Sequence, residues 1–244
     1  MIIMARKNYI WAVFKNDTIV PQLKEEKMKK ILLITILSLA AFSGKAQDRL
    51  VPASSGIYSP YTSIYDVYLS ELLIGQWNEF AYICTPSFTN EYALKCWIPG
   101  GPNRQNERIL VLREAKFNVW YKFDGFEIDR KKLPKLKEDY YNEYTLEVNQ
   151  EVVEPIKNLL EAFVYDSRFL RPDEDIISLD GTSFTFLVSG AAGECHNPKD
   201  GTLCLELVQI MNDLSNCVKN GNATKLPSIV ERANALLLKY NNSL

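Results

Sequence analysis

The stretch QWNEFAYICTPSFTNEYALKCWI, residues Gln76–Ile98, decides the fold, because its apolar side chains recur with a period of two. This period is typical of β-strands that bury one face. We predict that Gln76–Thr85 and Glu91–Ile98 form a β-hairpin centred near Asn90. Such a hairpin begins an antiparallel sheet, and the residues on either side indicate how that sheet is completed.

The residues that follow predict an antiparallel meander. Ile109–Leu112 is an apolar run typical of a buried strand. Phe117–Phe123 alternates apolar and polar residues up to the turn signal Asp124-Gly125, and we predict a further strand there. Arg130–Lys137 is basic and contains a proline, which favours a solvated linker. Tyr144–Val148 then predicts a short strand.

Helical spacing precedes this meander. We predict a helix that begins at Ser59-Pro60, a good N-terminal signal, and ends at Ile74, with Gly75 as the residue that terminates it. Four tyrosines fall at helical spacing on one face of this helix, namely Tyr58, Tyr61, Tyr65 and Tyr68.

Helical spacing also follows the meander. Val152–Phe163 predicts a helix, Ser183–Val188 a strand and Ser189–Gly201 an irregular loop, before two closing helices that begin near Leu203 and Leu226. The order of elements predicts an α+β fold. We expect an antiparallel sheet with helices packed mainly on one face and a C-terminal helix pair.

A second stretch, Met28–Gln47, predicts a secretory signal peptide. Two lysines, the apolar run Ile31–Phe42 and the small residues Gly44 and Ala46 follow one another, which indicates cleavage between Ala46 and Gln47. A helix of twelve residues rises about 18 Å, and a bilayer core is about 30 Å thick. We therefore expect no integral membrane anchor after cleavage.

The signal divides the chain into segments. Residues 1–27 are expected to be a misassigned start, with Met28 the true first residue, or else an extended leader. Residues 28–46 form the signal peptide, 47–56 a flexible leader and 57–244 a single α+β domain. The Met-Lys-Lys start and the Lys-Ala-Gln end resemble Sec-exported proteins of Bacteroidota without a named domain family. The resemblance implies a periplasmic or extracellular location.

The charge balance limits the class of partner. The whole chain has a formal net charge of −2, and the balance becomes −7 when residues 1–46 are removed, because they carry eight basic and three acidic residues. An acidic surface disfavours nucleic-acid backbones and anionic membranes as partners.

Five cysteines remain after cleavage, and an oxidising compartment favours disulfides. We predict Cys84–Cys96, because a hairpin centred near Asn90 places these residues opposite each other. We also predict Cys195–Cys204, which flank a short turn-rich loop. Cys217 lies about 20 Å from Cys204 along a shared helix and is therefore predicted to be a free, inert thiol.

The chain has one histidine, His196, directly after Glu194 and Cys195. A Cys beside a His suggests a nucleophile and its base, but adjacent side chains diverge, and a Cys195–Cys204 disulfide would remove the thiol. We therefore predict no catalytic residue, with Cys195, His196 and Glu194 as the alternative set. No spacing matches a zinc site, a phosphate loop or a dinucleotide fingerprint, so we expect no metal and no cofactor.

These patterns favour an exported binding protein without catalysis, whose partner is a protein or a surface glycan. Tyrosine combines a large apolar ring with a polar tip, which suits such partners. The face formed by Tyr58, Tyr61, Tyr65 and Tyr68 is the possible binding surface. Two alternatives remain, namely a hydrolase that uses the Glu194–His196 loop and a structural component of the envelope.

Overall fold

The computed structural model describes residues 49–53, 69–75, 79–100, 104–123, 138–167 and 181–243. The chain divides into two units, Met1–Lys45 and Ala46–Leu244, and all described residues belong to the second. The predicted signal peptide, the tyrosine face of residues 58–68, the basic linker and the acidic residues 173–180 lie outside the described residues.

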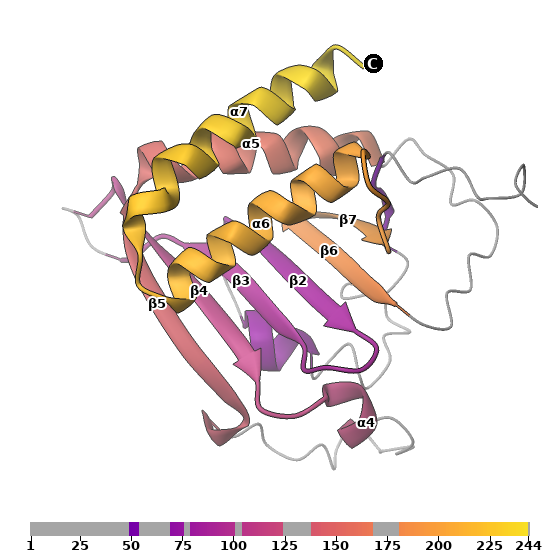
Figure 1. The fold of residues 1–244 in the computed structure, drawn as a ribbon. Helices are drawn as coiled ribbons and strands as arrows, with labels where there is room; N and C mark the ends of the chain where they lie inside the picture. The colour runs from indigo at the N-terminus through magenta and orange to yellow at the C-terminus, as the bar shows by residue number, and fades with distance from the viewer. Residues whose placement is uncertain are drawn as a thin grey trace, which may run out of the picture. The chain divides into compact units, whose positions relative to one another are not determined.

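A seven-stranded antiparallel sheet forms the centre of this unit (Figure 1). The spatial order of the strands is β1-β7-β6-β2-β3-β4-β5. Their bounds are Val51–Pro52 for β1, Phe80–Pro86 for β2, Tyr92–Trp97 for β3, Glu107–Ala115 for β4, Tyr141–Asn149 for β5, Thr182–Val188 for β6 and Ala191–His196 for β7. β2, β3 and β4 confirm the first three strands of the predicted meander, and β5, predicted as a separate short strand, is its fourth. β6 pairs with the other side of β2.

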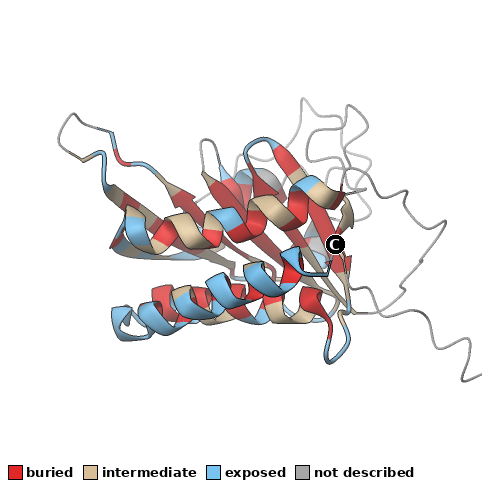
Figure 2. Cartoon of the chain, turned by 90° about the horizontal axis from the view of Figure 1, so that it is seen from above, coloured by how far each residue is buried: buried red, intermediate tan, exposed pale blue. Residues whose placement is uncertain are grey.

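Three long helices lie over one face of the sheet (Figure 1). They are α5 (Gln150–Ser167), α6 (Leu203–Lys219) and α7 (Leu226–Asn241). Thr202 starts α6, because its hydroxyl accepts a hydrogen bond from the amide of Leu205. Seen from above, the buried residues of these helices lie on their inner sides (Figure 2). The predicted α+β class, with its antiparallel sheet and C-terminal helix pair, is confirmed.

The two faces of the sheet pack differently. The helix-covered face holds the larger apolar core, which includes Phe80, Tyr82 and Phe186 from the sheet. The opposite face, which we call the back face, packs a smaller cluster against two short segments, η1 (Ser70–Ile74) and α4 (Val119–Phe123). Each cluster excludes water from one side of the central strands, so the sheet is buried on both faces at its middle.

The predicted end of the first helix is confirmed at Ile74. Gly75 follows with a φ of 65°, the left-handed conformation in which glycine ends helices. Two cationic side chains on the back face donate hydrogen bonds to the last carbonyl groups of η1. Lys95 Nζ donates to the carbonyl of Ile74 at 2.6 Å, and Arg113 Nη1 donates to the carbonyl of Leu72 at 3.3 Å. Positive charge at this end of a helix stabilises it.

The observed register corrects the predicted Cys84–Cys96 disulfide. Cys84 pairs with Tyr92 and Phe80 pairs with Cys96, so the hairpin is centred on Phe88 instead of Asn90. The two cysteines are therefore four positions apart along the ladder, about 13 Å, which is too far for a disulfide. All five cysteines are free and buried.

The predicted Cys195–Cys204 disulfide is also wrong, although the two residues do meet. Cys195 lies on β7 and Cys204 is the second residue of α6, and both are fully buried thiols. A hydrogen bond with Cys204, together with burial, holds the pKa of Cys195 far above its usual value. Cys217 is also a free, buried thiol, and burial raises its pKa.

Two further segments differ from the sequence prediction. The alternating stretch after Phe117 contains the helix α4, because the Asn118 side chain accepts from the amide of Tyr121 and a Glu91 carboxylate oxygen accepts from the amide of Val119. The segment predicted as a loop contains β7. Ser189 and Gly190 have φ angles of 51° and 75°, which form a two-residue hairpin turn between β6 and β7.

Candidate functional site

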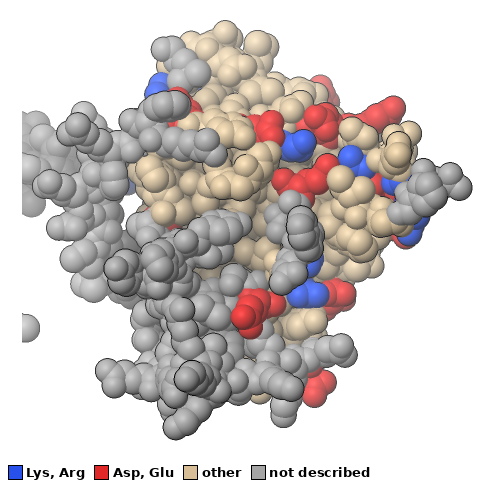
Figure 3. Space-filling view, turned by 180° about the vertical axis from the view of Figure 1, so that it is seen from behind, with Lys and Arg blue, Asp and Glu red and all other residues tan. Residues whose placement is uncertain are grey.

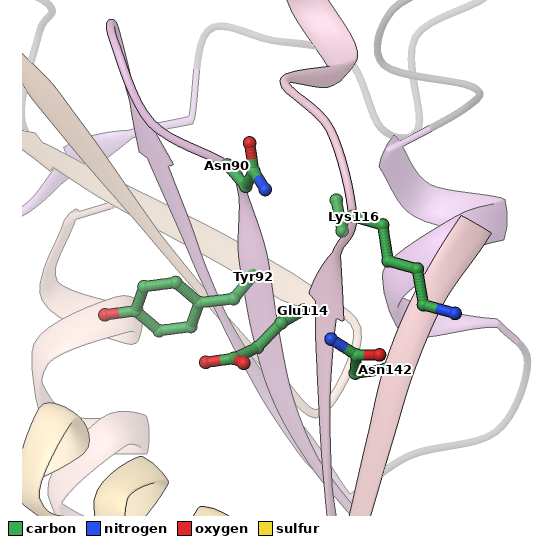
Figure 4. A pocket seen from close by; sticks show the side chains of 6 residues that line it. Asn90, Tyr92, Glu114, Lys116 and Asn142 are labelled. Carbon is green, nitrogen blue, oxygen red and sulfur yellow. The ribbon is translucent and has the colours of Figure 1, made fainter. Parts of the chain in front are cut away.

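A hollow of about 350 Å³ lies at one end of β3, β4 and β5 (Figure 4). We call it the strand-end hollow, and its lining residues are Asn90, Tyr92, Glu114, Ala115, Lys116 and Asn142. The register explains this gathering, because Tyr92 pairs with Glu114, and Glu114 pairs with Asn142. Paired residues on neighbouring strands point to the same face, so three polar side chains form a row across three strands.

Tyr92 is held in place by α6. Its hydroxyl donates to Oδ1 of Asn212 at 2.7 Å, and the hydroxyl of Tyr82 donates to the same oxygen at 2.7 Å. Burial is the main cause that raises the pKa of Tyr92, so this hydroxyl stays protonated. An amide oxygen has two lone pairs, and Asn212 uses both to fix the sheet to the helix. The inner wall of the hollow is therefore rigid.

Glu114 and Lys116 are the charged residues that line the hollow, and Glu114 forms an ion pair with Lys219. Lys219, the last residue of α6, donates from Nζ to Oε1 of Glu114 at 2.8 Å. That hydrogen bond raises the pKa of Lys219. The Lys219 ammonium also lies 6.0 Å from the ring centroid of Tyr144. The pair leaves the second carboxylate oxygen of Glu114 as a hydrogen-bond acceptor at the hollow.

The outer rim of the hollow is polar and exposed. Asn90 lies in the β2–β3 connection, Asn142 lies on β5, and Lys116 follows β4; all three are exposed. Backbone hydrogen bonds fix the rim, since the amide of Ala115 donates to the carbonyl of Glu91 and the amide of Lys116 donates to the carbonyl of Tyr140. The hollow thus offers amide, carboxylate and ammonium groups on a fixed backbone.

Two exposed aromatic side chains lie on segments that are continuous in sequence with this rim. Phe88, in the same connection as Asn90, is 70% exposed, and Tyr121 of α4 is 66% exposed. The two segments are joined, because the Asn118 side-chain amide donates to the carbonyl of Thr89 at 2.8 Å. Large exposed rings beside a polar hollow are a common feature of binding surfaces.

The alternative catalytic set from the sequence is split by the strand geometry. Glu194, Cys195 and His196 are consecutive on β7, so Cys195 points into the helix-side core while Glu194 and His196 share the back face. The structure does not bring the thiol to the imidazole. It instead places the Oγ of Ser183 2.7 Å from Nδ1 of His196, and Nε2 of His196 lies 3.4 Å from Oε1 of Glu194.

The sequence analysis missed both the hollow and Ser183. The signal for Ser183 was the pair Ser189-Gly190, which is typical of a two-residue hairpin turn and would have placed Ser183 opposite His196. For the hollow, the sequence analysis set no register between Glu91–Ile98 and Ile109–Leu112, so it did not pair Tyr92 with Glu114. Within the described ranges, no three His, Cys, Asp or Glu side chains gather in a way that could hold a metal ion.

Comparisons with protein-family models, with curated proteins and with solved structures found no match for this chain. In the part of the chain that the structure describes, no helix has the length and apolar character needed to cross a membrane. Acidic and basic side chains are interspersed on the visible described part of the back face (Figure 3).

Proposed function

We propose that this chain is an exported binding protein that holds a saccharide of a surface glycan in the strand-end hollow, without converting it chemically. The observation that supports this most is the row of Tyr92, Glu114 and Asn142 on three paired strands. A sugar ring presents hydroxyl groups in a fixed geometry. Side-chain amides and a carboxylate on a rigid backbone match such hydroxyl groups as acceptors and donors.

The volume and the lining both favour a small polar ligand. A hollow of about 350 Å³ is at the lower end of the range for ligand pockets, enough for one or two sugar rings. The lining has amides, a carboxylate and an ammonium group, and Glu114 is already paired with Lys219. That pair is neutral overall, and the exposed Lys116 adds one positive charge that solvent screens, so the attraction for a strongly charged ligand is small.

The exposed aromatic residues support a ligand longer than the hollow. Phe88 lies in the connection that carries Asn90, and Tyr121 lies on α4, which begins three residues after Lys116. Aromatic rings stack on the apolar faces of sugar rings and contribute large contact area at low entropic cost. We propose that further sugars of an extended glycan contact these rings, and the predicted signal peptide would bring the protein to the compartment where such glycans occur.

A glycan array followed by isothermal titration calorimetry tests this function. Binding of a neutral oligosaccharide is expected to weaken about five- to thirtyfold in Glu114→Gln and in Asn142→Ala. The first replaces a charged acceptor by a neutral amide and the second removes an amide, and each change is worth about 1–2 kcal/mol. Leu238→Ala is the matched control, since Leu238 is 64% exposed on α7, and it should bind as the unchanged protein does.

Other results would favour the remaining hypotheses. A protein captured by the same surface, with loss of binding in Phe88→Ala but not in Glu114→Gln, would support a protein partner in place of a glycan. A tight homo-oligomer in light scattering, together with no glycan binding, would contradict the proposal and support a structural role in the envelope. Binding is measured only for variants whose circular dichroism shows that they are folded.

A further inference from the structure

The β6–β7 hairpin carries a second group of polar side chains, on the back face. Ser183 and His196 are directly paired across the two strands, and Glu194 is two residues before His196 on the same face. Hydrogen-bonding distances join Ser183 Oγ to His196 Nδ1 (2.7 Å) and His196 Nε2 to Glu194 Oε1 (3.4 Å). A hydroxyl, an imidazole and a carboxylate therefore form one continuous relay.

Burial increases along this relay. The Ser183 residue is half-buried, the His196 side chain is 31% exposed, and Glu194 is only 4% exposed. The relay thus runs from a half-buried serine to a carboxylate held inside the protein. A buried carboxylate beside an imidazole fixes the ring orientation and favours the tautomer that donates to it.

The backbone around Ser183 is held firmly. Asn197 Oδ1 accepts from the amide of Thr182 at 2.7 Å, and Ser87 Oγ accepts from the amide of Gly181 at 2.9 Å. A Cβ atom on Gly181 would lie 1.9 Å from the Asn197 side chain, so only glycine fits there. These contacts fix the start of β6 and with it the position of the Ser183 hydroxyl.

We propose that Ser183 is a nucleophile and that this site reacts with small activated carboxylic esters. With Nε2–H donating to Glu194, Nδ1 accepts the hydrogen bond of the Ser183 hydroxyl and can take its proton. The serine oxygen forms a bond to the ester carbonyl carbon while His196 takes the proton. The carbon–oxygen bond to the leaving alcohol then breaks, and His196 returns the proton to that oxygen. Water later hydrolyses the acyl-serine, so one ester and one water give one acid and one alcohol.

In this site Ser183 and His196 are the catalytic residues, and Glu194 is a positioning residue. The neighbouring thiol has no part, since Cys195 points to the opposite face and its pKa is raised far above the usual range. The site is separate from the strand-end hollow, which lies on β3, β4 and β5. Variants of the hollow should therefore leave the reactivity of Ser183 unchanged, and a failure of either proposal does not affect the other.

Covalent labelling of the full chain tests the nucleophile. A fluorophosphonate probe should add one label, because the serine oxygen forms a bond to phosphorus as fluoride leaves, and peptide mapping of the unchanged protein should place the label on Ser183. Ser183→Ala should not be labelled. His196→Gln should be labelled at least 100-fold more slowly, in line with the contribution of about 10²–10⁴ from a general base.

Ser189→Ala is the matched control, because Ser189 lies on the same hairpin and donates to Glu161 instead of a histidine. It should be labelled, and should hydrolyse p-nitrophenyl acetate, at the rate of the unchanged protein. No label after prolonged exposure, or a label on another serine, would overturn the proposal. The mapping needs no variant, so it stays decisive even where a substitution prevents folding.

The positioning role of Glu194 has its own spectroscopic test. The chain contains a single histidine, so selective ¹⁵N labelling of histidine in an untagged protein gives signals from His196 alone. We expect the neutral ring to carry its proton on Nε2. Glu194→Gln should convert this to a mixture of tautomers and slow labelling of Ser183 while circular dichroism stays unchanged. A ring protonated on Nδ1 in the unchanged protein would contradict the relay.

Discussion

The β2–β3 and β6–β7 hairpins lie in one sheet and differ in how their turns set the register. Between β2 and β3 the chain runs through five residues, Ser87–Glu91, and this connection carries the rim of the strand-end hollow. Between β6 and β7 it turns in two residues, Ser189 and Gly190. The short turn fixes the pairing of Ser183 with His196, whereas the longer one leaves the pairing to packing.

The largest expected loss of stability comes from a buried side chain inside a hairpin, and an exposed side chain in a turn should cost far less. Phe186 on β6 is fully buried beside Tyr82, with ring centroids 5.3 Å apart. Phe186→Ala should lower the free energy of unfolding by about 3–5 kcal/mol, because it leaves a cavity in the core. Phe88→Ala, in the exposed β2–β3 turn, should change it by less than about 0.5 kcal/mol. Urea unfolding measures both, and equal effects would contradict the assigned packing.

The next effect concerns the backbone at the start of β6. Gly181→Ala would bring a Cβ atom into the Asn197 side chain at a φ of 142°, and we expect a loss of about 2–3 kcal/mol. Gly190→Ala is the control, because its φ is 75° and no atom lies within 4 Å of the added Cβ. Strain alone should then cost about 1 kcal/mol. A smaller loss for Gly181→Ala than for Gly190→Ala in thermal unfolding would reject the tight contact.

A third prediction concerns the link between the β2–β3 hairpin and α6. Asn212→Ala leaves the hydroxyls of Tyr82 and Tyr92 without the acceptor they share, and we expect a loss of about 1–3 kcal/mol. Tyr82→Phe and Tyr92→Phe should each cost less, because Asn212 keeps one donor. A double-mutant cycle should give a coupling between Asn212 and each tyrosine. Additive effects would show that the hydroxyls do not share the amide oxygen.

The smallest effect is a dependence of stability on alkaline pH. Burial raises the pKa of the Cys84 thiol to about 11, well above its usual value. As pH rises, the thiol ionises first in the unfolded chain and only later in the folded one. The contribution of this thiol to stability is complete below pH 9 and is lost between about pH 9 and 11. Cys84→Ala should lose part of this slope in unfolding measured across that range, and an unchanged slope would contradict it.

The sequence alone predicts the helices and strands correctly wherever the apolar residues keep one period over many residues. The helices near Val152–Phe163, Leu203 and Leu226, the first three strands of the meander and the α+β class were predicted from apolar spacing alone and are confirmed. Long periodic segments bury one face whatever they pack against. The signal peptide at Met28–Gln47 and the tyrosine face stay predictions, because they lie outside the described residues.

The sequence was insufficient where short-range hydrogen bonds decide the structure. α4 forms because Asn118 and Glu91 accept hydrogen bonds from amides at its start, although the apolar pattern there has a strand period. The disulfides failed for different reasons. A shift of two residues in the hairpin centre separates Cys84 from Cys96, whereas Cys195 and Cys204 are adjacent and remain thiols. The spacing of cysteines in the sequence gives neither the register of the β2–β3 hairpin nor the oxidation state of two neighbouring thiols.

The place of β6 beside β2 has a consequence for folding kinetics. Phe80 pairs with Val188, more than one hundred residues later in the chain, so the central strand acquires its second neighbour only when most of the polypeptide exists. Contacts between residues so distant in sequence require a large loop to close and slow folding. We expect the nascent chain to remain unfolded until β6 has been synthesised, which is the state that passage through a translocation channel requires.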